Sequence, residues 1–354
     1  MENAPALLEL VRSGLPCALQ RASLEQHGNA ARLLSAMDRD GSRSAVDRRR
    51  IDADLAWLAQ PDRRLVAWHE DDYPPLLRHS PCPPAVLFVE GNMELLASAQ
   101  VAIVGSRRPS PGGRDHARRF ASELAEAGLA ITSGLAEGID TAAHEAALRC
   151  GKTIAVVATG LDEAYPASNA LLMRRIAAEG VVLSEHPPGT RAIRQHFPSR
   201  NRMIAGLSLG TLVVEAALRS GALITARLAG DAGREVFAIP GSIHNPMARG
   251  CHRLIRQGAA LVESPEEILE ALTPFAARLQ QPLLSTTGDG RTVDAAPGPK
   301  ALRRLWNALG HDPVTIDQLA ARTGLTLASL APMLLTMELD GRVQAEHGRY
   351  ARRP

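Results

Sequence analysis

Val101-Ala102-Ile103-Val104-Gly105-Ser106-Arg107-Arg108 is the stretch that decides the fold of this 354-residue chain. Its first four residues are apolar, as in a buried strand. A glycine, a hydroxyl and two guanidinium groups follow directly, where open α/β sheets bind their ligands. No Gly-x-Gly-x-x-Gly pattern follows, and the arginines place positive charge where a dinucleotide needs bare backbone. The stretch therefore predicts a strand that ends in a site for a polyanion, and we expect no cofactor.

Strand-like and helix-like segments alternate around this stretch. Apolar segments suited to strands lie at 101–104, 130–132, 153–157, 181–184, 211–214 and 235–239. Helical patterns lie between them, at 113–127, 140–150, 168–179 and 220–232. This alternation predicts an α/β fold of the extended Rossmann-like kind, with a parallel sheet covered on both faces. Small residues follow most of the strands, so they converge on one edge of the sheet, as a ligand crevice requires.

Changes in pattern divide the chain into four expected domains. Residues 1–60 predict a small helical (SAM-like) module, because short helical patterns alternate with Gly and Pro breaks. Residues 61–275 form the extended Rossmann-like domain. Residues 276–299 gather Gln, Thr, Gly and Pro and predict a linker. Residues 300–354 suggest three helices and a hairpin, which is the outline of a winged helix.

Composition limits the possible partners. The net charge is only +2 and aromatic residues make up 3% of the chain, so a nucleic acid would be held mainly through local clusters and phosphates. No apolar run is long enough to cross a bilayer and no signal segment is evident, so we expect a cytoplasmic protein without membrane contact. The four cysteines are scattered, which predicts reduced structural thiols and no metal site.

A second basic cluster lies at 191–202. Four arginines, one histidine and Phe197 fall within this segment, which resembles a set of phosphate clamps with one base-stacking ring. No acidic residue lies within it, so its arginines are expected to be free of salt bridges. A third candidate follows strand 211–214, where Glu215 precedes Ser220-Gly221. Free amides at the start of the next helix would complete an anion site there.

Other combinations do not predict catalysis. Gly151-Lys152-Thr153 precedes a strand and lacks the first glycine of a P-loop. Asp140 and His144 share a helix face, but they are expected to be a helix cap and a packed histidine. Glu185-His186 has no serine or cysteine nucleophile placed to use it. We therefore predict no catalytic residue, no metal ligand and no enzymatic activity.

These segments closely resemble the bacterial DNA-processing protein A family (DprA, also called Smf). The matching stretches are Val101–Ser110, Ser133–Asp140 with Ala143-His144-Glu145, Gly160–Pro166, Leu183–Glu185, Phe197–Ser208, Val213–Ala226 and Gly233–Gly241. The resemblance implies a Rossmann domain that binds single-stranded DNA without a nucleotide. It also implies protection of incoming strands in natural transformation, loading of the RecA recombinase, and a homodimer formed through the Rossmann domain.

The residues and the resemblance together predict one DNA-binding set. Its members are Gly105, Ser106, Arg107, Arg108, Arg194, Phe197, Arg200, Asn201, Arg202, Ser220 and Gly221. One position departs from the family, because Ala167 follows Tyr165-Pro166 where some members have a basic residue. This difference predicts slightly weaker binding or a shifted path of the strand.

Two alternatives stay open. Related Rossmann proteins cleave nucleoside monophosphates, but they carry Pro-Gly-Gly-x-Gly-Thr where this chain has Pro111-Gly112-Gly113-Arg114-Asp115. The other alternative is a scaffold whose winged helix recruits a partner, with incidental DNA binding. The expected recognition helix, Thr326–Asp340, contains no Lys or Arg. A helix that enters a major groove needs basic or amide side chains, so a module for interactions is favoured over a sequence reader.

Overall fold

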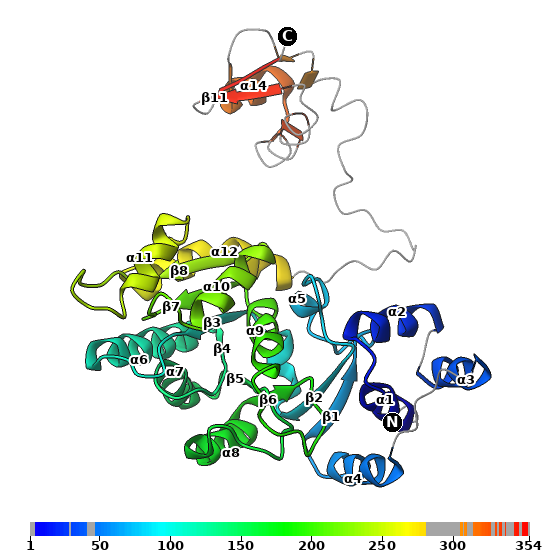
Figure 1. Cartoon of the computed structure of the whole chain (residues 1–354). Coiled ribbons are helices and arrows are strands. Elements are labelled where there is room, and N and C mark those ends of the chain that lie inside the picture. Colours follow the sequence, from blue (N-terminus) through cyan, green and yellow to red (C-terminus); the bar gives the residue numbers. More distant parts are fainter. Residues whose placement is uncertain are drawn as a thin grey trace. The chain divides into compact units, whose positions relative to one another are not determined.

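The computed structural model describes residues 4–27, 30–40, 47–280, 305–306, 308–309, 314–326, 330, 333–334, 337, 343–346 and 349–352. The chain forms two compact units, residues 1–282 and 283–354 (Figure 1). Among the described residues no helix is long and apolar enough to span a membrane.

A nine-stranded sheet is the centre of the first unit. Its order is β1-β2-β6-β5-β4-β3-β7-β8-β9. The strands are β1 (Arg63–Ala67), β2 (Val86–Gly91), β3 (Gln100–Val104), β4 (Ala130–Ser133), β5 (Thr153–Val156), β6 (Val181–Ser184), β7 (Gly210–Val213), β8 (Glu235–Ala238) and β9 (Ala260–Leu261). Strands β3 to β9 pair in parallel, which confirms the Rossmann-like α/β fold. Strands β1 and β2, which precede the segments of that prediction, extend the sheet in antiparallel fashion.

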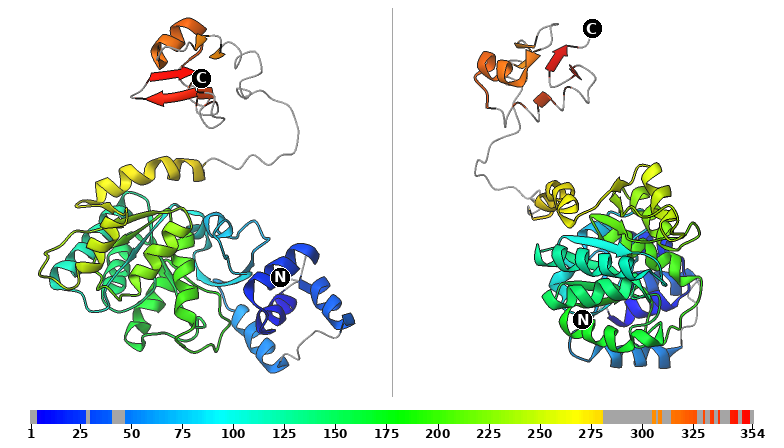
Figure 2. Two further views of the ribbon diagram at one scale, coloured as in Figure 1. Left: turned by 45° about the horizontal axis from the view of Figure 1, so that its top comes forward. Right: turned by 90° about the vertical axis from the view of Figure 1, so that its left-hand side faces the viewer.

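Helices cover both faces of this sheet (Figure 2). The residues of β3 alternate between the faces, as a strand requires. Val101 and Ile103 pack with α6 and α7, whereas Ala102 and Val104 pack with α9, α10 and α11. The helices that follow β3 are α6 (Pro111–Glu126), α7 (Ile139–Ala147), η2 (Leu148–Cys150), η3 (Ala167–Asn169), α8 (Ala170–Glu179), α9 (His196–Leu207), α10 (Ala222–Asp231), α11 (Arg249–Arg256) and α12 (Pro265–Gln280). Helix α9 was not expected from the sequence. It includes residues 196–202, so more than half of the basic segment 191–202 is helical.

The amino-terminal helices pack against the antiparallel extension of the sheet. They are α1 (Ala4–Arg12), α2 (Cys17–His27), α3 (Ala30–Asp40) and α4 (Arg48–Leu58), and the connection to β3 adds α5 (Pro75–Arg78) and η1 (Met93–Ala97). Leu7, Leu10 and Leu24 share a buried cluster with Ala67 of β1 and Val86 of β2. The helical module thus shares its core with the sheet, and the predicted domain boundary near residue 60 stays a prediction.

The second unit contains a three-stranded sheet in the order β10-β12-β11. Its described elements are β10 (Val314–Thr315), α14 (Ile316–Thr323), β11 (Val343–Glu346) and β12 (Arg349–Arg352). The predicted hairpin is present, with Val343 paired to Arg352. Most of the expected recognition helix lies outside the described residues. Its described side chains Leu330, Met333, Leu334 and Met337 are buried in the core of this unit.

Candidate nucleic-acid interface

A cleft of about 730 Å³ opens beside the carboxyl ends of β3 and β7. These strands are neighbours, but the chain leaves β3 toward α6 on one face and β7 toward α10 on the other. Such a reversal is where open α/β sheets leave room for a ligand. Eight of the predicted binding residues line this cleft: Gly105, Arg107, Arg194, Phe197, Arg200, Asn201, Ser220 and Gly221.

The other three predicted residues do not line the cleft. Ser106 is buried, and its Oγ accepts a hydrogen bond of 3.0 Å from the amide of Arg108. The side chain of Arg108 is exposed outside the cleft. Arg202 pairs with Glu185. Ser106 therefore shapes the loop that presents Arg107.

A second loop holds this arginine loop in place. Gly138 has a φ of +85°, and a Cβ there would collide with the carbonyl oxygen of Ser106. The amide of Ile139 donates a hydrogen bond of 3.1 Å to that same oxygen. Glycine is needed at 138 both for its backbone conformation and for this close approach. The loop after β4 thus sets the position of the loop after β3.

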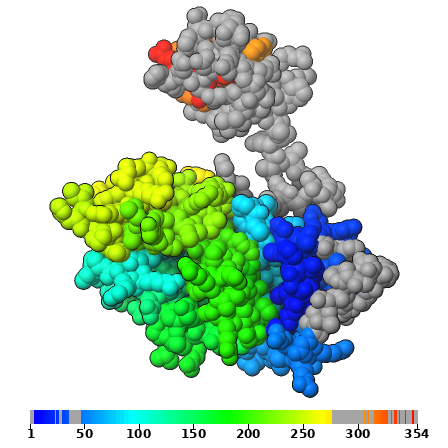
Figure 3. Space-filling view, in the orientation of Figure 1, coloured from blue at the N-terminus to red at the C-terminus, as the bar shows by residue number. Residues whose placement is uncertain are grey.

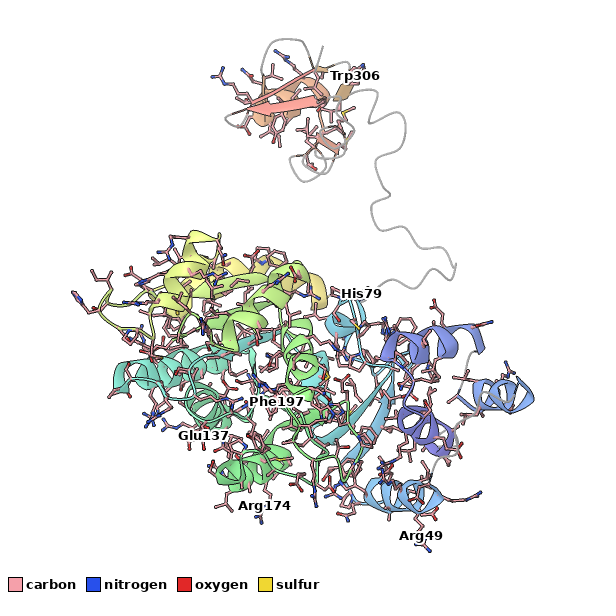
Figure 4. The ribbon with its side chains drawn as sticks, in the orientation of Figure 1. Arg49, His79, Glu137, Arg174, Phe197 and Trp306 are labelled. Atoms are coloured by element: carbon pink, nitrogen blue, oxygen red, sulfur yellow. The ribbon has the colours of Figure 1, made fainter. Side chains whose placement is uncertain are left out.

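Phe197 lines the cleft and is the second residue of α9 (Figure 4). The guanidinium carbons of Arg107 and Arg200 each lie 5.7 Å from the centre of its ring. The ring of Tyr165 meets it edge to face at 5.7 Å, and Tyr165 remains 46% exposed. Aromatic and guanidinium planes are the groups on which unstacked bases stack. The sequence predictions did not include Tyr165, although it stands inside one of the family-like stretches.

Arg200 is buried and faces an acid from another element. Its Nη1 lies 3.9 Å from Oδ2 of Asp140, and a side chain at Gly134 would collide with the same guanidinium group. Burial lowers the pKa of Arg200 and raises the pKa of Asp140, while their attraction opposes both shifts. The expectation that the arginines of 191–202 are free of salt bridges was therefore wrong. The partner comes from a distant part of the chain.

Asp140 has a different role from the expected helix cap. The N-cap of α7 is Gly138, and Asp140 lies inside the helix. Its carboxylate accepts hydrogen bonds from the amides of Gly134 and Ala136, at 3.1 and 3.3 Å. It thereby holds the loop after β4 as well as Arg200.

Arg202 is also paired. Its guanidinium group donates to the carboxylate of Glu185 and to the carbonyl oxygen of Cys82. The ring of His186 stacks on that of His196, the first residue of α9, with 3.9 Å between the ring centres. Burial lowers the pKa of His186 to about 4, which outweighs the opposing effect of Glu185. His186 thus contacts the first residue of α9, and Glu185 holds the helix at Arg202.

The N-terminus of α6, which follows the arginine loop, is already occupied by the carboxylate of Glu215. Oε2 and Oε1 of Glu215 accept hydrogen bonds from the amide and the hydroxyl of Ser110, at 2.8 and 2.6 Å. A Cβ at Gly113 would collide with this carboxylate, and Asn245 donates to it at 3.2 Å. The carboxylate of Glu215 thus takes the position that a phosphate would occupy at this N-terminus. At α10, by contrast, the N-cap residue is Gly221, and the side-chain contact given for the first amides is that of Ser220, whose hydroxyl accepts a hydrogen bond of 3.3 Å from the amide of Ala222.

His144 has a structural role. His144 is completely buried, its Nδ1 lies 2.7 Å from Oγ1 of Thr153, and burial lowers its pKa to about 3. It is the packed histidine that the sequence predicts. In the described part of the chain no three His, Cys, Asp or Glu side chains are placed to hold a metal ion, and the four cysteines are unpaired.

The fold and the site define a Rossmann-like α/β protein with an arginine-rich cleft at the point where the strand order reverses. The chain belongs to the family described as DNA recombination-mediator protein A, which matches residues 64–273. The winged helix domain of DprA matches residues 291–349, which confirms the expected fold of the second unit.

Similar proteins agree with this assignment. Protein Smf of Escherichia coli is 43% identical over 308 residues, which cover 86% of this chain and 81% of the relative. The X-ray structure of DNA processing protein A from Streptococcus pneumoniae has 39% identity and a TM-score of 0.65, covering 75% of this chain and 97% of that chain. A structure that concerns the single-stranded DNA binding mode of DNA processing protein A from Helicobacter pylori has 31% identity and a TM-score of 0.55, covering 59% and 99%.

Proposed function

We propose that the cleft binds single-stranded DNA and that the chain acts as a non-catalytic recombination mediator. The observation that carries this proposal is the convergence of eight predicted residues on one cleft around Phe197. Arg107 and Arg194 are exposed and supply positive charge for phosphates. Phe197 and Tyr165 supply surfaces for unpaired bases.

Single strands suit this cleft better than duplex DNA. A base can stack on Phe197 only if it leaves its own stack, and in a duplex this costs a few kcal/mol. The Helicobacter pylori relative, whose structure concerns single-stranded DNA binding, supports this preference. The contacts are with phosphates and ring faces, so we expect little dependence on base sequence.

Membership of the family supports a proposal for the biological role. We propose that the protein protects incoming strands during natural transformation and loads the RecA recombinase onto them, in the cytoplasm and as a homodimer formed through the Rossmann domain. Light scattering of the full chain tests whether the protein is a dimer.

A RecA strand-exchange reaction on strands coated with single-strand-binding protein tests the loading of RecA. The Arg107→Glu variant, which is expected to be deficient in DNA binding, is the control.

The first experiment compares matched single- and double-stranded oligonucleotides by fluorescence anisotropy. The wild type is expected to prefer the single strand, and Arg107→Glu to lose this preference. Arg174→Glu is the matched control, since Arg174 is exposed on α8 and lies outside the cleft (Figure 4). Equal affinity for both DNA forms in the wild type, or unchanged binding by Arg107→Glu, contradicts the proposal.

A further inference from the structure

The loop between β6 and α9, residues 185–195, brings Arg194 to the cleft. We call this segment the β6–α9 loop. Ala192 and Arg194 line the cleft, and Arg191, Ile193 and Arg194 are exposed. The conformation of this loop therefore decides where the charge of Arg194 lies.

One contact to the loop comes from the amino-terminal helical module. Nε and Nη2 of Arg12, on α1, lie 2.5 and 2.7 Å from the two carboxylate oxygens of Asp54, on α4. The same Nη2 donates a hydrogen bond of 3.0 Å to the carbonyl oxygen of Pro188 in the β6–α9 loop. In Figure 3 the dark blue surface of the amino-terminal helices borders the green surface of the middle of the chain. Arg12 therefore joins two helices of the module to a loop that lies 176 residues further along the chain.

The ion pair of Arg12 and Asp54 is buried, with side chains that are 12% and 1% exposed. Compared with apolar side chains of similar size, a buried ion pair adds little to stability, so folding alone does not explain it. A guanidinium group is planar and holds its N–H groups in a fixed fork. Because Asp54 fixes one edge of this group, the direction of the hydrogen bond to Pro188 is fixed as well.

The segment after β5 holds the β6–α9 loop from another side. The amide of Gly189 lies 2.8 Å from both carboxylate oxygens of Asp162 and donates to them. The amide of Gly160 donates a hydrogen bond of 2.9 Å to the carbonyl oxygen of Thr190. The first half of the loop is thus fixed by two parts of the chain, and one of them is the helical module.

A second connection runs from the module to α9 itself. Sγ of Cys17, on α2, donates to the carbonyl oxygen of Pro83 at 3.3 Å. The neighbouring carbonyl oxygen, that of Cys82, accepts a hydrogen bond from the guanidinium group of Arg202 on α9. The module therefore contacts the loop before α9 directly and reaches the helix through one further segment.

From these contacts we infer that the amino-terminal helical module takes part in DNA binding, with Arg12 as a positioning residue for Arg194. Arg12 lies outside the cleft and fixes Pro188, and the rest of the β6–α9 loop then presents Arg194 to a phosphate. Without this contact the loop has more conformations available, and binding has to order it at a cost in free energy. The inference rests on the proposed function and extends it to a part of the chain beyond the cleft.

The test separates positioning from stability with the double variant Arg12→Met/Asp54→Leu of the full chain. Apolar side chains replace the buried pair, so chemical denaturation should give an unfolding free energy close to that of the wild type. The donor to Pro188 is lost. In anisotropy titrations with an oligothymidylate of about 20 nucleotides, the slope of log affinity against log salt should fall by about 0.7, the value for one phosphate contact. This change corresponds to a loss of affinity of about fivefold at ~0.1 M salt.

A double-mutant cycle tests whether the effect passes through Arg194. Arg194→Gln alone should lower the slope by the same amount, and adding Arg12→Met/Asp54→Leu should lower it no further. The matched control is Arg63→Met/Glu90→Leu. It replaces a partly buried ion pair of 3.1 Å between β1 and β2, beside Trp57 of the module. This control should bind with the slope and affinity of the wild type.

Arg12→Lys is the second variant, and it decides the test if the apolar pair does not fold. It keeps a positive charge beside Asp54 but replaces the fork by a single ammonium group, so it should also lower the slope. Wild-type affinity and slope in the folded variants overturn the inference, as does an equal loss in the Arg63→Met/Glu90→Leu control. A further loss of slope in the Arg194→Gln background contradicts the action through Arg194. If the wild type does not bind single strands, the proposed function itself fails.

Discussion

The loop after β3 and the helix α9 both bring arginines to the cleft, but they hold them in different ways. Arg107 is exposed and touches the ring of Phe197 without an ion pair among the described residues. Arg200 is buried against Asp140, and Arg202 is bound to Glu185. The arginine loop therefore offers charge to a ligand, whereas two of the arginines on α9 mainly hold the helix and its aromatic ring in place. A count of arginines in a segment overstates the charge that a ligand can use.

The largest expected effect concerns stability. Asp140→Ala leaves Arg200 buried without its partner, and breaking such a pair costs about 3–5 kcal/mol of unfolding free energy. Arg107→Ala, at an exposed position, should change this free energy by less than about 0.5 kcal/mol. Chemical denaturation followed by tryptophan fluorescence measures both values. The double variant Asp140→Ala/Arg200→Leu should recover part of the loss. Equal destabilisation by Asp140→Ala and Arg107→Ala would contradict the distinction between the loop and the helix.

The next effect concerns the ring that the two arginines share. Phe197→Ala should weaken binding of single-stranded DNA by about 1–3 kcal/mol, the usual value for one stacked base. Phe197→Trp should keep most of the affinity because it keeps a flat surface. Anisotropy titrations at one salt concentration compare the variants. If the Phe197→Ala variant binds single-stranded DNA as tightly as the wild type does, the ring only fills space beside Arg107.

A smaller effect separates two arginines of the basic segment, Arg194 and Arg202. Arg194 lines the cleft and is exposed, so Arg194→Gln should lower the salt slope of binding by about 0.7. Arg202→Gln should leave the slope unchanged, because Glu185 and Cys82 already engage this side chain. Titrations at four or more salt concentrations determine each slope. An equal change for both variants would show that Arg202 leaves Glu185 when DNA binds.

The smallest effect concerns the unfolding free energy at low pH. The pKa of His186 falls from 6.5 to about 4 in the folded protein, so the unfolded state takes up its proton first. The stability linked to this residue is present above pH 6.5 and is lost as the pH falls through 4. His186→Asn should therefore flatten the fall of the unfolding free energy between these values, measured by denaturation at several pH values. His144→Asn is not a suitable control, since that histidine titrates in a similar way.

Local patterns predicted most of the parallel sheet, because the central strands are short apolar runs and most of them are followed by a glycine or a hydroxyl. Strand β9 has only two residues and exists through its pairing with β8, so no pattern could reveal it. Strand β1 begins with two arginines and lies at the edge of the sheet, where little apolar character is needed. Helix α9 contains Pro198 in its first turn, where a missing amide does no harm, and the segment could be taken for an extended clamp.

The sequence by itself determined the type of site: arginines, glycines and one ring at the ends of parallel strands, in the order of the recombination-mediator family. Only the tertiary structure decided which of these groups are available. Asp140, Glu185 and Glu215 come from other segments and reach Arg200, Arg202 and the N-terminus of α6 through the packing of the sheet. Charge interactions act over a few ångströms in space whatever the separation along the chain. The arginines that remain free for a ligand could therefore be identified only after the strands and helices were placed.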